Sequence, residues 1–90
     1  MKIEYDIAKA QANIQKHGVS FSEAEAVLLD PYALTKEDKD LRDEPRYITL
    51  GMGGAERVLV VVWTARGDAC RIISAWKANL PQRRRYERQF

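Results

Sequence analysis

The first third of the chain has the spacing of apolar residues that is typical of one short strand followed by two helices. Lys2 to Tyr5 alternate apolar and polar side chains, which predicts a strand. Apolar residues then recur at helical spacing between Asp6, a suitable N-cap, and Gly18, a suitable left-handed residue at the helix end. A second helical pattern runs from a capping box that starts at Ser20 to Asp30, which precedes a proline.

The second half contains three strand-like runs and one short helical segment. The runs are Arg46–Met52, Arg57–Thr64 and Cys70–Trp76, and the short glycine-containing segments between them predict two hairpins and an antiparallel meander. Asn79 is a suitable cap for a basic C-terminal helix. Residues 35–45 alternate acids and bases with almost no apolar content, so we expect an exposed, mobile loop there. Together these patterns predict an α+β fold in which helices pack on one antiparallel sheet.

Composition and length limit the class of protein. With 90 residues, of which 46% are hydrophobic, the chain can bury one core, and we expect residues 1–90 to form a single domain. The longest apolar run, Val58–Trp63, is too short to cross a bilayer, and the acidic N-terminus does not resemble a signal peptide. Cys70 is the single cysteine and cannot form an internal disulfide. These features agree with a cytoplasmic protein that is not associated with a membrane.

Charge is distributed unevenly along the chain. Residues 1–45 hold 6 Lys/Arg and 10 Asp/Glu, a net charge of −4, whereas residues 46–90 hold 9 Lys/Arg and 3 Asp/Glu, a net charge of +6. Only Lys77 among those nine cations is a lysine. Arginine matches phosphate with a planar fork of donors and stacks on bases, so the bias indicates a nucleic-acid partner. A solvated charged face is the alternative explanation.

A hydrolase with this sequence would have to work without a metal ion held by the protein. One cysteine and one histidine cannot build a structural metal site, and no glycine-rich nucleotide-binding loop is present. RNA can be cleaved without a protein-held metal because its 2′-hydroxyl is an internal nucleophile. The protein then has to supply a proton acceptor, a proton donor and cations around the phosphate.

Four cations are the candidates for binding that phosphate. Strand alternation places Arg71 and Lys77 on one face of the last strand, and we expect both to converge with Arg46 and Arg66 at one end of the sheet. A surface salt bridge is the alternative role for each of them. Arginines of the C-terminal helix could also contact RNA or could face solvent: Arg83, Arg84, Arg85 and Arg88.

Two residues are the candidates for proton transfer. His17 is the only side chain whose ordinary pKa suits acid-base chemistry near neutrality. It lies in the last turn before Gly18, however, so a helix-capping role is the preferred interpretation. Glu44 is a possible base just before the sheet, and an ordinary loop carboxylate is its alternative identity.

A set of short segments spread over nearly the whole chain resembles one family. The segments are Tyr5-Asp6, Asn13, Lys16 to Phe21, Asp30-Pro31, Glu44, Arg46, Gly51, Leu59 to Thr64, Arg66-Gly67-Asp68 and Arg71 to Ala75. They are similar to the BrnT family, ribonuclease toxins of type II toxin-antitoxin modules with a RelE-like fold. The resemblance implies RNA cleavage in the cytoplasm, inhibition of translation and neutralisation by a BrnA-like antitoxin. Promoter DNA would be reached only through that antitoxin, and a homodimer is compatible with this reading.

One position departs from the family pattern. That pattern usually reads Ser-Ala-Arg and then a basic residue, whereas this chain reads Ser74-Ala75-Trp76-Lys77. Tryptophan stacks on a base but cannot neutralise a phosphate. We therefore expect ribonuclease activity that is reduced or lost unless Lys77 substitutes, as in an attenuated variant.

The expected mechanism follows from these candidates. Arg46, Arg66 and Arg71 hold the phosphate with help from Lys77, while Glu44 or His17 moves protons, and the product ends in a 2′,3′-cyclic phosphate. An alternative is a non-catalytic subunit with the toxin fold that binds the antitoxin and modulates its binding to operator DNA. A plain RNA-binding domain is the third interpretation.

Overall fold

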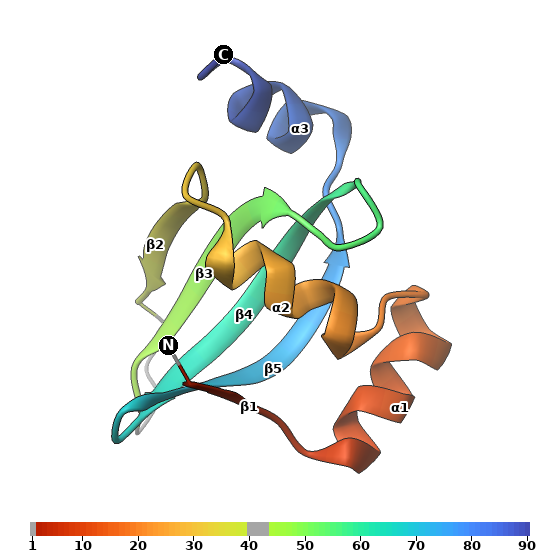
Figure 1. Cartoon of the computed structure of the whole chain (residues 1–90), viewed down its shortest axis with the longest axis vertical. Helices are drawn as coiled ribbons and strands as arrows, with labels where there is room; N and C mark the ends of the chain where they lie inside the picture. Colours follow the sequence, from red (N-terminus) through yellow and green to blue (C-terminus); the bar gives the residue numbers. More distant parts are fainter. Residues whose placement is uncertain (1, 40–43) are drawn as a thin grey trace.

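Figure 1 shows a computed structural model of the chain, which describes residues 2–39 and 44–90. Along these residues the elements are β1 (Lys2–Glu4), α1 (Ile7–His17), α2 (Phe21–Leu29), β2 (Leu34–Asp38), β3 (Arg46–Met52), β4 (Val58–Arg66), β5 (Ala69–Lys77) and α3 (Leu80–Glu87). The expected α+β class is confirmed. None of the described helices is long and apolar enough to cross a membrane.

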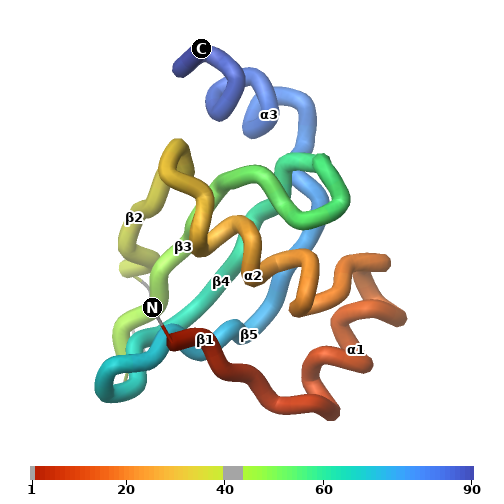
Figure 2. Tube along the Cα trace, viewed as in Figure 1, coloured from red at the N-terminus to blue at the C-terminus, as the bar shows by residue number. Residues whose placement is uncertain are grey.

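The strands form one mixed sheet in the order β1-β5-β4-β3-β2. β3, β4 and β5 pair as the antiparallel meander that the sequence predicts. β2 extends this meander with another antiparallel pairing. β1 pairs with β5 in parallel, so the expectation of a purely antiparallel sheet is wrong. Figure 2 shows β1 next to β5, although the two strands are far apart in sequence.

The strand β2 corrects the expectation of an exposed loop over residues 35–45. Leu34 lies opposite Leu50, and the hydroxyls of Thr35 and Thr49 are joined by a hydrogen bond of 2.8 Å. The next residues of β2 are charged and mostly exposed, which is common in strands at the edge of a sheet. The charged side chains led the sequence analysis to predict a loop, whereas pairing with β3 makes this segment a strand. Residues 40–43 of the expected loop lie outside the described residues.

Local capping signals explain both ends of the first helix and the start of the other two. Asp6 accepts hydrogen bonds from two backbone N–H groups of α1, and Gly18 ends that helix with φ of 69°. Ser20 and Asn79 cap α2 and α3 as predicted. The carboxylate of Glu23, expected to return a bond to Ser20, instead binds Arg57.

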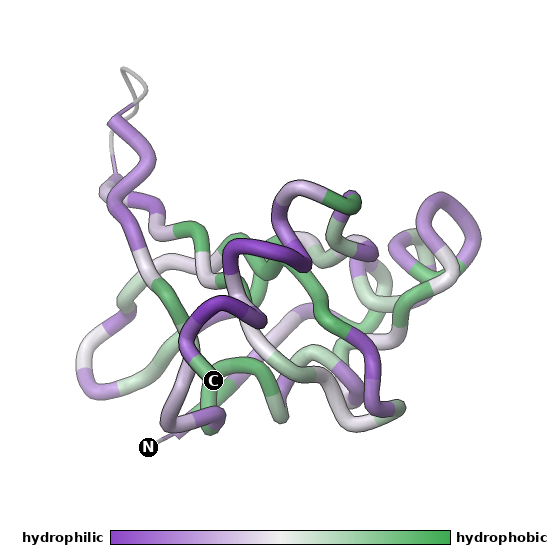
Figure 3. The backbone as a smooth tube through the Cα atoms, turned by 90° about the horizontal axis from the view of Figure 1, so that it is seen from above, coloured by the Kyte–Doolittle hydropathy of each residue, from purple (hydrophilic) through white to green (hydrophobic). Residues whose placement is uncertain are grey.

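The two faces of the sheet carry separate apolar clusters. The first face packs against α1 and α2 through Val19, Phe21, Ala24, Val27, Leu59, Val61, Ile72 and Ala75. The second face carries Leu50, Val58 and Val60, which pack with Ala78 and with Tyr86 of α3. In Figure 1, α2 crosses in front of β3, β4 and β5, while α3 lies beyond the top end of the sheet. Figure 3 shows hydrophobic stretches alternating with hydrophilic ones along the trace.

A β-bulge in β5 changes which of its residues share a face. Val62 of β4 lies opposite Ser74, but the next residue, Trp63, lies opposite Ile72, so Ile73 is the extra residue of the bulge. Ile72 and Ala75 consequently both reach the first-face core. Residues of β5 before the bulge and after it do not follow one simple alternation.

Candidate functional site

Three of the candidate arginines gather at one end of the second face. Thr64 of β4 pairs with Arg71, and Arg66 follows two positions later on the same face. Arg46 of β3 lies beside Thr64 of β4, because the two strands are antiparallel and the neighbouring pair joins Tyr47 to Trp63. We call Arg46, Arg66 and Arg71 the arginine end; its members come from three neighbouring strands, as the sequence predicts.

Among residues 2–39 and 44–90, the arginine end forms two long ion pairs with acids. Arg66 Nη2 lies 3.9 Å from Glu44 Oε2, and Arg71 Nη1 lies 4.0 Å from Glu4 Oε2. Exposed ion pairs at such distances contribute little to stability. The Nε of Arg46 is buried and has no hydrogen-bond partner among the described residues. A buried donor without a partner is unusual, and an anion bound at this end would satisfy it.

Lys77 does not join the arginine end. It lies opposite Leu59, several residue pairs away from the pairing of Thr64 with Arg71. The bulge at Ile73 also places Arg71 on the second face and Lys77 on the first, so the expectation that they share a face is wrong. Regular alternation was the basis of that expectation, and the extra residue breaks it.

Lys77 instead lies with His17 around Trp76. An open depression at this side of the sheet is lined by Lys16, His17, Ser74, Trp76 and Lys77. The rings of His17 and Trp76 are tilted by 42° with centroids 5.8 Å apart. His17 also lies in the last turn of α1 next to Gly18, where the sequence predicts a capping residue. The two candidates for proton transfer, His17 and Glu44, are therefore in different places.

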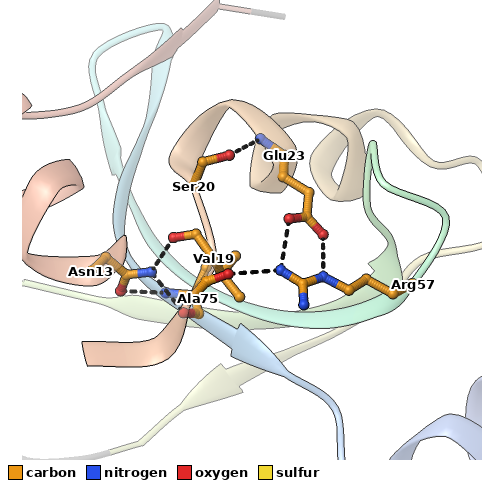
Figure 4. Close-up of polar contacts among 7 residues, drawn as sticks. Asn13, Val19, Ser20, Glu23, Arg57 and Ala75 are labelled. Atoms are coloured by element: carbon orange, nitrogen blue, oxygen red, sulfur yellow. Dashed lines mark hydrogen bonds and ion pairs between the residues drawn. The ribbon is translucent and has the colours of Figure 1, made fainter. Parts of the chain in front are cut away.

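Polar contacts join α1 to β5 and Arg57 to α2, as Figure 4 shows. The buried amide of Asn13 donates to the carbonyls of Val19 and Ala75 at 2.9 and 2.8 Å, and its oxygen accepts from the Ala75 N–H at 3.1 Å. Arg57 donates to both carboxylate oxygens of Glu23 and to the Gly18 carbonyl. The hydrogen bond to Glu23 is the main reason that the pKa of Arg57 is raised.

The arginines of α3 are exposed, and one of them lines a pocket. Arg83, Arg84 and Arg88 face solvent, whereas Arg85 also borders a pocket with Lys36 of β2 and Gln82 of α3. Sequence reasoning missed Lys36 because the charged stretch around it was assigned to a loop. Nothing in the sequence signals that Gln82, three residues after the helix cap Asn79, would reach the same pocket.

Metal binding finds no support among the described residues. Within 2–39 and 44–90, no group of three or more His, Cys, Asp or Glu side chains is arranged to hold a metal ion. The charged groups described at the arginine end are guanidinium and carboxylate groups. They can bind an anion such as phosphate and accept a proton beside it.

Comparisons with known proteins identify the family. Among curated proteins, none is significantly similar to this chain in sequence. Among solved structures, the crystal structure of the Brucella abortus ribonuclease toxin BrnT is similar, with a TM-score of 0.69 and 29% identity over 88% of this chain and 97% of that one. A sequence model of the ribonuclease toxin BrnT of type II toxin-antitoxin systems matches residues 5–80. Since this match spans most of the chain, the protein belongs to the BrnT family of ribonuclease toxins of type II toxin-antitoxin systems.

Proposed function

We propose that this toxin cleaves RNA at a phosphate bound by the arginine end, without a metal ion. The observation that carries the proposal is the meeting of Arg46, Arg66 and Arg71 from three strands beside a carboxylate, Glu44. The family is one of ribonuclease toxins, which supports this activity for the fold.

In the proposed reaction the arginines bind the phosphate and offset the charge that grows on it. Glu44 accepts the proton of the 2′-hydroxyl, whose oxygen attacks the adjacent phosphorus. The bond to the 5′-oxygen breaks, this oxygen takes a proton from water, and the products are a 2′,3′-cyclic phosphate and a 5′-hydroxyl. We assign the proton acceptor to Glu44 rather than to His17, because Glu44 lies 3.9 Å from Arg66 and His17 packs on Trp76.

The depression around Trp76 has a secondary role in this proposal. Lys16 and Lys77 contribute positive charge there, and the exposed part of Trp76 offers a ring for stacking on a base. The tryptophan cannot replace the charge of the arginine that the family pattern has at this position. The chain is therefore proposed to be an attenuated nuclease, in which Lys77 supplies only part of the missing charge.

A toxin of this family has an antitoxin as its partner. We propose a BrnA-like antitoxin that neutralises the toxin and that alone contacts promoter DNA. Trp76 also favours a second candidate function, a non-catalytic subunit that binds the antitoxin and modulates operator binding. In that case the fold is retained for the interaction and the cleavage is lost.

A cleavage assay on a defined RNA in EDTA tests the proposal. We expect a cyclic-phosphate product, and we expect Arg71→Gln to lower the rate by roughly 100-fold or more, since one charge-stabilising donor contributes about 3 to 4 kcal/mol. Lys9→Gln removes the same charge from exposed α1 and should keep the wild-type rate. Intact RNA together with tight antitoxin binding would instead support the non-catalytic subunit. Intact RNA that is retained in a gel-shift assay would support a plain RNA-binding domain.

A further inference from the structure

A small pocket lies between α3 and the second face of the sheet. Its volume is about 110 Å³. The apolar residues that line it come from β2, β3 and β4: Leu34, Ile48, Leu50 and Val60. A closed apolar cavity of about 150 Å³ can hold a benzene ring. This open pocket therefore has room for most of one planar ring, with the remainder of the ring outside.

The rim of the pocket is polar and positively charged. Lys36 and Arg85 border it, and neither of them forms an ion pair with an acid in the described part of the chain. Gln82 is held in place because its Oε1 accepts the N–H of Asn79 at 2.8 Å. No described residue accepts a hydrogen bond from the NH₂ group of Gln82, so this group can donate one to a ligand. An apolar interior with two cations and one amide donor at the rim suits a flat ring that is attached to an anion.

The pocket is adjacent to the arginine end. Lys36 and Ile48, which line it, pair with one another, and the pair of Asp38 with Arg46 lies two residues further along the same strands. Two residues along a strand cover roughly 7 Å, and side chains two positions apart lie on the same face. A ring in the pocket is thus about one nucleotide away from a phosphate at Arg46.

We infer that this pocket is a subsite for one base of the RNA, with Arg85 stacked on the base or bound to its phosphate. The inference rests on the proposed function, because it takes RNA as the ligand of the second face. The inference adds to the proposed function a binding site for the base of one nucleotide, next to the phosphate that is cleaved. Residues 81–90, which include Gln82 and Arg85, follow the segment that the family model matches, so this subsite includes residues beyond that segment.

An apolar side chain of a protein partner would also fit the pocket by size. The charge of the rim favours the nucleotide, since two cations that have no acidic partner among the described residues attract phosphate. Arginine also stacks on bases through its planar guanidinium. The experiment below separates the two occupants.

The test is an NMR titration of the whole chain with small probes that need no cleavage. Uridine and adenosine 5′-monophosphate are compared with ribose 5-phosphate, which has the phosphate and lacks the base. We expect the nucleotides to shift the amides of Ile48, Leu50 and Val60 and to bind roughly 5-fold or more tightly than ribose 5-phosphate. Arg85→Gln should reduce this preference for the base. Arg84→Gln removes the same charge from α3 outside the pocket and should keep the preference.

Several outcomes overturn the inference. Equal affinity for ribose 5-phosphate and the nucleotides, or nucleotide-induced shifts confined to the arginine end, shows that the pocket binds no base. Shifts at the pocket amides with acetyl-Glu-Leu-amide, and none with the nucleotides, assign the pocket to a protein partner. Because binding is read without cleavage, RNA cleavage with no nucleotide in the pocket refutes only this inference. Conversely, nucleotide binding there with no cleavage by the chain refutes only the proposed nuclease.

Discussion

Asn13 is a single polar residue that takes the place of a neighbouring strand. β1 pairs with β5 only from Ala69 to Arg71, so the edge of β5 near Ala75 has no strand beside it. The Asn13 amide binds both the N–H and the carbonyl of Ala75, as a peptide group of a paired strand would. Asn13 is 6% exposed, which means that water cannot easily replace these bonds.

Asn13→Ala should lower the free energy of unfolding by about 2 to 4 kcal/mol, because it leaves buried backbone groups without partners. Gln15→Ala, on the exposed side of the same helix, is the control and should change stability by less than about 0.5 kcal/mol. Urea denaturation of both variants gives the comparison. A loss for Asn13→Ala no larger than that of the control would show that these hydrogen bonds are not needed.

Trp76 stands at the position where the sequence resemblance leads us to expect an arginine. It lies opposite Val60 on the second face, and its ring contacts His17. Trp76 is partly exposed and lines the same depression as Lys77, so an arginine side chain at position 76 has room to enter that depression.

Trp76→Arg should raise the rate of RNA cleavage by roughly ten-fold or more and strengthen growth arrest, because it adds a charge that can stabilise the transition state. Leu80→Arg adds the same charge at an exposed position outside the depression and is the matched control. Single-turnover cleavage of one RNA by the two variants measures the difference. Equal rates for Trp76→Arg and the wild type would exclude attenuation by the tryptophan.

At the scale of elements, Tyr86 is the buried side chain through which α3 packs on the rest of the fold. Tyr86 is 3% exposed and packs against Leu50 and Val58, while its hydroxyl donates to Asp30 Oδ2 at 2.5 Å. Burial, followed by the hydrogen bond to Asp30, raises the pKa of Tyr86 to about 12. Burial would raise the pKa of Asp30, but the hydrogen bonds donated by Tyr86 and by the Met52 and Tyr32 N–H groups outweigh it, and the pKa is lowered.

Tyr86→Phe should destabilise the fold by about 1 to 2 kcal/mol at neutral pH, because Asp30 loses a buried donor. The unfolded chain ionises tyrosine near pH 10 and the folded chain near 12, so the contribution of the neutral hydroxyl is complete below pH 10 and is lost as the pH rises towards 12. The stability difference between wild type and variant should therefore shrink over this window. Urea melts from pH 7 to 12 measure it, with Tyr32→Phe, an exposed tyrosine, as control. A difference that stays constant with pH would contradict the assignment.

At the scale of the whole molecule, the arginines proposed to contact RNA all come from the basic second half of the chain. All three residues of the arginine end and the arginines of α3 come from residues 46–90, which carry a net charge of +6. The acidic first half contributes the helices that cover the first face of the sheet. The two halves also meet, because Arg57, Arg66 and Arg71 of the second half form ion pairs with acids of the first half, which are Glu23, Glu44 and Glu4.

Binding of an uncleavable 2′-O-methyl RNA should weaken linearly on a plot of log affinity against log salt concentration, since counterions are released from the RNA. Arg66→Gln should make the slope shallower by about 0.7, the value expected for one phosphate contact on a single strand. Lys9→Gln, in the acidic half, should leave the slope unchanged. Fluorescence anisotropy over a range of salt concentrations measures both, and an identical slope for Arg66→Gln and the wild type would remove Arg66 from the phosphate site.

The sequence by itself determined the features that depend on neighbours in the chain. Caps at Asp6, Gly18, Ser20 and Asn79 bond to backbone groups within a few residues, so the starts of the helices were predicted. The meander was predicted as well, since its connections are short. The gathering of the three arginines at one end followed from this meander.

Only the tertiary structure decided what depends on partners distant in sequence. β2 is a strand because β3 pairs with it, and its charged residues do not reveal this pairing. The extra residue Ile73 sends Lys77 away from Arg71, and an extra residue in a strand shows only when the partner strand is counted against it. The pocket of Lys36, Gln82 and Arg85 likewise requires α3 to fold back onto the sheet. Local hydrogen bonds can be read along a chain, whereas register and the meeting of distant side chains are set by packing.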